Sequence, residues 1–159
     1  MSTFRTVITV AFCAALACIA RPAQSNEQDA FWQVQTSAYT RHFSSSPEHN
    51  NRQNLLGLER NEASGWLYGA ATFRNSFDQQ SVYAYAGKRF ESADHPVYAK
   101  LSGGLLYGYK GQYRNKIPLN HFGVAPAFIP GVGVRLGAVS VEVVLLGASA
   151  AMANVGLRF

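Results

Sequence analysis

The chain has 159 residues, a formal net charge of +5 and only two cysteines. That length suits one domain built around one core. Because the excess of basic residues is mild and scattered along the chain, nucleic acid is excluded as an expected partner, and anionic lipid headgroups are favoured.

The first twenty residues carry the pattern of a secretory signal peptide. Arg5 supplies a positive start, residues 7–19 are apolar, and small residues follow them. The apolar stretch is too short for a membrane-spanning helix, which needs about 20 such residues. A lipoprotein signal with a lipidated Cys18 is the alternative. We expect residues 1–20 to be removed, so that the exported chain has no cysteine, and residues 21–30 to form a short tether.

From residue 31 onward the sequence predicts β-strands, because side-chain type alternates with period two between turn-forming stretches. The expected strands cover residues 31–43, 55–60, 65–73, 81–90, 97–109, 125–136, 139–146 and 151–159. Most of the turns are short, and no helical pattern of useful length follows the signal. The prediction is an all-β fold, an eight-stranded antiparallel up-and-down barrel over residues 31–159.

Two features favour a transmembrane barrel of the bacterial outer membrane. Val155, Leu157 and Phe159 alternate at the end of the sequence, as in the C-terminal assembly signal of such barrels. Aromatic residues make up 13% of the chain, and many lie near the expected strand ends, where a membrane barrel carries its aromatic girdles. A secreted soluble barrel or sandwich is the alternative. We expect a monomer.

The polar residues His42, Asn75 and Ser76 are candidate catalytic residues. His42 ends the first expected strand, and Asn75-Ser76 lies in the turn after the third. Those two strands run in the same direction, so their ends meet at the same rim of an up-and-down barrel, and a histidine can meet a serine there. The alternative is that Ser76 is an ordinary turn residue.

Pro126 and Pro130 interrupt the sixth expected strand. Proline has no N–H to donate to a ladder, so it lies where pairing is broken. We expect a lateral gate at this strand that admits an acyl chain from the bilayer. A simple bulge near the rim is the alternative.

The chain resembles the lipid A palmitoyltransferase (PagP) family over most of its expected mature length. The similar segments are Thr40–His42, His49–Arg52, Leu56–Arg60, Trp66–Gly69, Phe73–Phe77, Ile117–Leu119, Ala127–Gly133 and Leu157–Phe159. The resemblance implies transfer of a palmitoyl chain from a phospholipid donor to lipid A in the outer leaflet. The family's essential His, Asp and Ser fall on His42, Asn75 and Ser76.

The chain departs from the family at Asn75, because an amide cannot act as a base. It can still orient a neighbour or donate a hydrogen bond to an oxyanion. We therefore expect His42 to act as general base on the lipid A hydroxyl or on Ser76. Because no phosphate loop, zinc spacing or paired carboxylate occurs in the sequence, we expect no cofactor. A non-catalytic structural or adhesion barrel and a lipid hydrolase on the same scaffold are the alternatives.

Overall fold

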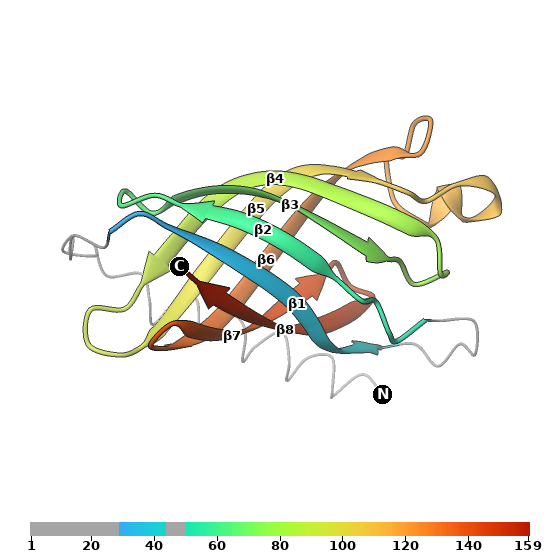
Figure 1. Ribbon diagram of the computed structural model, residues 1–159. Coiled ribbons are helices and arrows are strands. Elements are labelled where there is room, and N and C mark those ends of the chain that lie inside the picture. Colours follow the sequence, from blue (N-terminus) through green and yellow to red (C-terminus); the bar gives the residue numbers. More distant parts are fainter. Residues whose placement is uncertain (1–28, 44–49) are drawn as a thin grey trace.

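The structure is a computed structural model that describes residues 29–43 and 50–159. It is a closed antiparallel barrel in which each strand pairs with its sequence neighbours and the last strand pairs with the first (Figure 1). The strands are β1 (Phe31–His42), β2 (Leu56–Asn61), β3 (Trp66–Arg74), β4 (Gln80–Glu91), β5 (Val97–Tyr107), β6 (Val124–Leu136), β7 (Val139–Leu146) and β8 (Ala150–Arg158). The predicted eight-stranded up-and-down barrel is confirmed.

Alternation along each strand decides which side chains fill the barrel. On β4, Ser81, Tyr83 and Tyr85 are buried inside, whereas Val82 and Ala84 between them are exposed outside. A strand that is half-exposed in this way has one face for each environment. A slip of one residue in register would therefore exchange the two faces, which is why the period-two pattern fixes the pairing.

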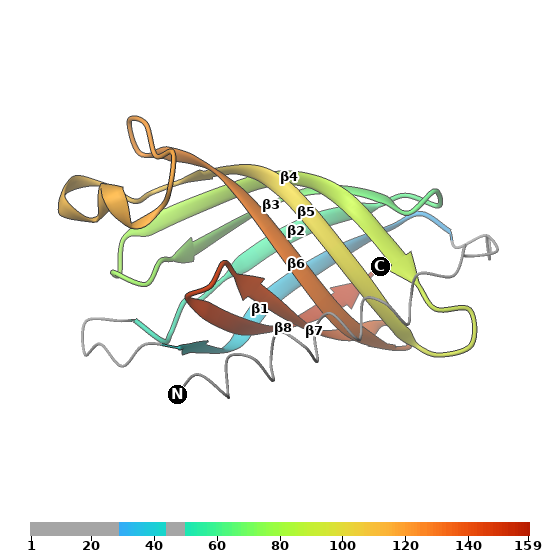
Figure 2. The same ribbon diagram turned by 180° about the vertical axis from the view of Figure 1, so that it is seen from behind.

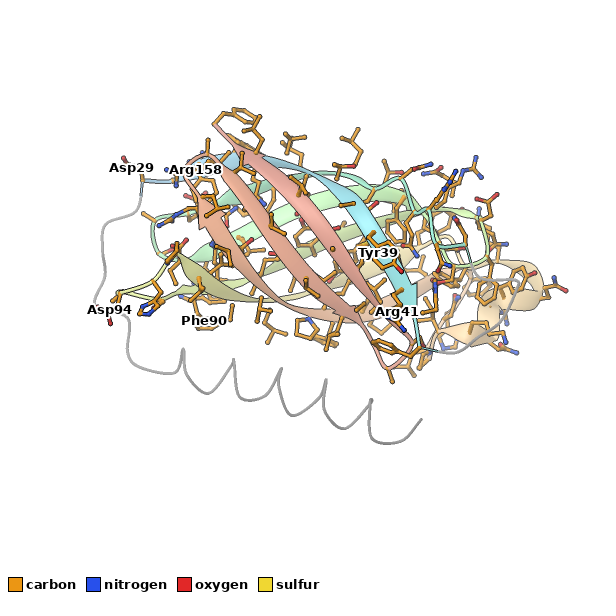
Figure 3. All side chains as sticks on the ribbon, turned by 90° about the horizontal axis from the view of Figure 1, so that it is seen from below. Asp29, Tyr39, Arg41, Phe90, Asp94 and Arg158 are labelled. Atoms are coloured by element: carbon orange, nitrogen blue, oxygen red, sulfur yellow. The ribbon has the colours of Figure 1, made fainter. Side chains whose placement is uncertain are left out.

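The outer face of the barrel carries a belt of large apolar side chains, and Figure 3 shows side chains projecting outward from the ribbon. Members of this belt include Leu56, Leu58, Trp66, Tyr68, Leu101, Leu105, Phe128, Val134, Val141, Val143, Val155 and Leu157. Phe128 is 73% exposed and Leu105 59%. A soluble protein rarely exposes a continuous apolar surface of this extent, so the belt needs an apolar partner.

The interior has two halves of different chemistry. In the half nearer His42, buried apolar residues form one cluster: Leu55, Ala71, Val144 and Met152, with Phe73, Ile129 and Leu146 against it. The other half holds buried charges beside the apolar Leu67 and the ring of Tyr98. There the Lys100 ammonium lies 3.2 Å from the Glu59 carboxylate and 2.8 Å from that of Glu142, and all three side chains are buried.

The two ends of the barrel differ in their connections, as Figures 1 and 2 show. We call the end that holds His42 the site rim and the end that holds Phe31 and Phe159 the terminal rim. Residues 43–55, 75–79, 108–123 and 147–149 connect the strands at the site rim, whereas residues 62–65, 92–96 and 137–138 connect them at the terminal rim. Most of the long connections therefore lie at the site rim.

The strand boundaries agree with the sequence prediction to within one residue, except at the end of β5. β5 ends at Tyr107 rather than at residue 109, because the chain turns at Gly108 with a φ of +134°. The connection after β5 contains a short 3-10 helix, η1 (Gly111–Lys116). β6 starts at Val124, so His121 precedes it and forms an isolated bridge with Val124.

The expected signal at residues 1–20 and most of the expected tether at 21–30 lie outside the described residues. Within residues 29–43 and 50–159, no helix has the length and apolar character that crossing a membrane requires.

Candidate active site

His42 and Ser76 meet at the site rim. β1 delivers His42 at its last position, and the turn between β3 and β4 delivers Ser76. The His42 Nε2 atom lies 2.7 Å from the Ser76 hydroxyl oxygen, although the two residues are 34 positions apart in sequence. This separation is within hydrogen-bond reach, which is the first requirement for a base and the hydroxyl that it activates. The predicted meeting of the two side chains is confirmed.

Asn51 completes a line of three side chains that sequence reasoning did not find. Its Oδ1 atom lies 2.8 Å from Nδ1 of His42, so the ring has a polar partner at each nitrogen. Asn51 lies in the connection between β1 and β2, where only the folded path of the loop decides which side chain faces the histidine. The sequence offered one hint, the resemblance of residues 49–52 to a family loop.

Asn75 lies in the turn between β3 and β4, beside Ser76, as predicted. Its side-chain oxygen accepts hydrogen bonds from the backbone N–H groups of Phe77 and Gln79, at 2.9 and 3.1 Å. Its amide nitrogen donates to the Ser81 hydroxyl at 3.1 Å, and the residue is only 1% exposed. These contacts shape the turn that presents Ser76, which agrees with the first of the two expected roles of Asn75, orienting a neighbour.

The turn that carries Ser76 is tied to the long connection between β5 and β6. Gln79 exchanges two hydrogen bonds with the backbone of Lys110, at 3.0 and 3.3 Å. The Phe77 ring stacks on Tyr113 of η1, with centroids 4.1 Å apart and an interplanar angle of 11°. Phe77 and Gln79, which follow Ser76, are therefore held against the connection between β5 and β6.

Tyr109 also borders Ser76. Burial raises the pKa of its phenol. The phenol is therefore neutral at physiological pH. Its ring makes an edge contact with Phe77, with the ring centroids 6.2 Å apart.

The site rim is strongly basic. Its described residues include six basic side chains and one carboxylate, that of Asp78. The six are Arg41, Arg52, Arg74, Lys110, Arg114 and Lys116. The terminal rim is nearly balanced, with five basic side chains (Arg60, Lys88, Arg89, Arg135 and Arg158) and four carboxylates (Asp29, Glu62, Glu91 and Asp94). Figure 3 labels Arg41 at one end, and Asp29, Asp94 and Arg158 at the other.

Pro126 and Pro130 lie beside a break in the barrel wall. β6 pairs with β5 over residues 124–134, but it pairs with β7 only over residues 131–136. The stretch 124–130 of β6 therefore has no β7 partner in the described chain. Inside the barrel, the Tyr83 hydroxyl donates to the Ala127 carbonyl and the Ser102 hydroxyl donates to the Ile129 carbonyl, each at 3.2 Å.

Two other features lie away from His42 and Ser76. A cavity of about 500 Å³ opens at the terminal rim, lined by residues that include Phe31, Arg89 and Arg135. Within the described residues, no group of His, Cys, Asp and Glu side chains has an arrangement that could hold a metal ion.

Comparison with known proteins supports the architecture. A solved structure described as a de novo designed transmembrane β-barrel superposes with a TM-score of 0.53, covering 83% of this chain and 98% of that one, at 9% sequence identity. At this identity the likeness concerns the fold alone. No family model matches the chain. No curated protein matches it either.

Proposed function

We propose that the protein is a monomeric outer-membrane acyltransferase that moves a palmitoyl chain from a phospholipid to lipid A. The observation that carries the proposal is the 2.7 Å contact between His42 Nε2 and the Ser76 hydroxyl at one mouth of the barrel. The proposed substrates, a phospholipid and lipid A, are inferred from the resemblance to the lipid A palmitoyltransferases. Donor and acceptor are both lipids, so a site at the edge of a membrane suits them.

The apolar belt supports placement in a bilayer. A closed barrel pairs each strand with its neighbours, so most backbone groups are satisfied internally, which lipid demands because it offers no hydrogen bonds. Outer-membrane barrels have short turns on the periplasmic side and longer loops outside. The site rim carries most of the long connections, so it would face the outside and lie at the level of the outer leaflet. Both proposed substrates, a phospholipid and lipid A, would be reached there.

The charge of the site rim supports anionic partners. Lipid A and phospholipid headgroups carry phosphates, and basic side chains near a membrane surface each contribute about 1 kcal/mol of attraction to anionic lipid. Arg52 and Lys110 belong to segments that hydrogen bond directly to the turn of Ser76 or its neighbours. Headgroups held by these side chains would lie beside the reacting hydroxyl.

The interior suits an acyl chain in the half next to the site. The buried cluster around Leu55, Val144 and Met152 is apolar, and the unpaired stretch of β6 opens the wall at the same level. A chain entering between β6 and β7 would leave its ester group near Ser76. His42 would then accept the proton of the attacking hydroxyl and return it to the leaving lysophospholipid.

A transfer assay tests the proposal directly. The purified barrel is incubated in mixed micelles with a phospholipid that carries a labelled palmitoyl chain, with and without lipid A. The proposal predicts labelled lipid A from the wild type and none from His42→Ala or Ser76→Ala. Release of free palmitate without an acceptor would instead favour the second candidate, a lipid hydrolase, because the same histidine and serine could activate water. A folded barrel with neither activity would indicate a structural role.

A further inference from the structure

The two hydrogen bonds of the His42 ring fix the position of its proton. The Asn51 atom beside Nδ1 is the amide oxygen, which can only accept a hydrogen bond. Nδ1 must therefore carry the hydrogen of the neutral ring. The lone pair of the ring is then on Nε2, which faces the Ser76 hydroxyl at 2.7 Å. In this tautomer Ser76 donates to the histidine, as the nucleophile of a triad does.

We propose that Asn51 is a positioning residue that sets the tautomer of His42, and that Ser76 is thereby the nucleophile that carries the acyl group between donor and acceptor. This inference rests on the proposed function for its acyl donor and acceptor. It goes beyond that function by choosing between the two roles open to His42, as base toward the acceptor hydroxyl alone or as base toward Ser76.

The loop holds Asn51 between two anchors on the neighbouring strand and turn. On one side the Asn50 N–H donates to the Ser76 carbonyl at 2.8 Å. On the other side the Arg74 N–H donates to the Gln53 carbonyl at 2.8 Å. The side chain of Asn50 also bridges to the backbone of Arg52, at 2.8 and 3.0 Å. Because the loop already holds the Asn51 side chain in place, little conformational entropy is lost when it contacts His42.

The reaction then has two balanced halves. In the first, the Ser76 oxygen bonds to the ester carbonyl carbon of the donor, its proton goes to His42 Nε2, the carbon–oxygen bond to the lysophospholipid breaks, and His42 protonates the departing alkoxide. In the second, the acceptor hydroxyl loses its proton to Nε2 and attacks the acyl carbon, and Ser76 leaves and recovers that proton. Asn51 keeps the Nδ1–H bond throughout both halves.

A fluorophosphonate probe tests the nucleophile without any lipid, because it reacts covalently with activated serines. The inference predicts that the folded wild-type barrel in detergent is labelled at Ser76 and that Ser76→Ala is not labelled. Labelling of Asn51→Leu or Asn51→Ala falls by on the order of a hundredfold, the scale of a positioned base. Asn51→Asp restores labelling, because a carboxylate also accepts from Nδ1–H. Asn115→Leu on exposed η1 is the matched control and leaves the rate unchanged.

Nitrogen NMR of the His42 ring reports which ring nitrogen carries the proton. That property would not change if Asn51 only stabilised the loop. We expect a neutral ring protonated at Nδ1 in the wild type and a mixture of tautomers in Asn51→Leu. A wild type without label on Ser76, a ring protonated at Nε2, or wild-type labelling of folded Asn51→Leu would each overturn the inference. Labelling at Ser76 without transfer to lipid A would instead refute the proposed function and leave the triad in place.

Discussion

Thr40 is a buried residue that the fold leaves with an unpartnered polar atom. It is 1% exposed, and its hydroxyl has no hydrogen-bond partner among the described residues. It precedes His42 by two positions on β1 and pairs with Met152 of the apolar cluster. A buried hydroxyl without a partner costs stability, since it loses water and gains nothing in return.

We therefore predict that Thr40→Val stabilises the barrel by about 1 kcal/mol. Urea unfolding in detergent, followed by tryptophan fluorescence, measures the change. Thr36→Val is the matched control on the same strand, because the Thr36 hydroxyl donates to the Leu55 carbonyl at 2.7 Å. That control should lose stability by a similar amount. Equal losses in both variants would show that the Thr40 hydroxyl does have a partner.

The sequence predicted His42 and Ser76 because their places depend only on strand direction, which the alternation determines. It could not predict the contact of Asn51 with His42, since that contact depends on the path of a loop. It assigned Asn75 a chemical role on the strength of the family pattern. In the structure that side chain makes hydrogen bonds within its own turn, and the spacing of residues in the sequence does not show which groups it bonds to.

Among the strands, β2, β5 and β7 are joined across the interior by charge. Lys100 on β5 lies between Glu59 on β2 and Glu142 on β7. Removing one partner from a buried ion pair leaves an uncompensated charge. Sequence alternation placed these residues on inner faces, but only the register of non-neighbouring strands brings them together, so the cluster was not predicted.

We predict that Lys100→Met destabilises the barrel by about 3–5 kcal/mol, because two buried carboxylates lose their counter-charge. The same urea unfolding assay measures it. Lys88→Met is the control, since Lys88 donates to the Ser64 carbonyl in an exposed hydrogen bond at the terminal rim, and its loss should cost less than about 1 kcal/mol. A loss no larger than the control's would show that Lys100 does not hold the three strands together.

The stretch 124–130 of β6, which has no β7 partner, leads to a prediction about lipid entry. Replacing Pro126 and Pro130 with alanine supplies N–H groups that the wall lacks, so the gap beside β7 becomes easier to close. We expect slower turnover of the double variant with phospholipid in bilayers, with the barrel still folded. Turnover equal to that of the wild type, in both detergent and bilayers, would remove the lateral gate from the account.

For the whole molecule, the contrast between the rims predicts its orientation in the membrane. Single cysteines at Gln112 on η1 and at Ala63 in a turn of the terminal rim both lie at exposed positions. The natural cysteines, Cys13 and Cys18, fall in the predicted signal, so the exported chain offers a clean background. We expect a membrane-impermeant maleimide to label Gln112→Cys on intact cells and Ala63→Cys only after lysis. The reverse pattern would place the site on the periplasmic side.

The central claim is acyl transfer to lipid A, and mass spectrometry of lipid A tests it most directly. Cells that lack lipid A palmitoylation would express the wild type, His42→Ala or Ser76→Ala, with each barrel confirmed as folded in the membrane. The account predicts lipid A heavier by one palmitoyl group with the wild type and unmodified lipid A with either variant. Unmodified lipid A from a folded wild-type barrel, or equal modification by the Ser76→Ala variant, would contradict it.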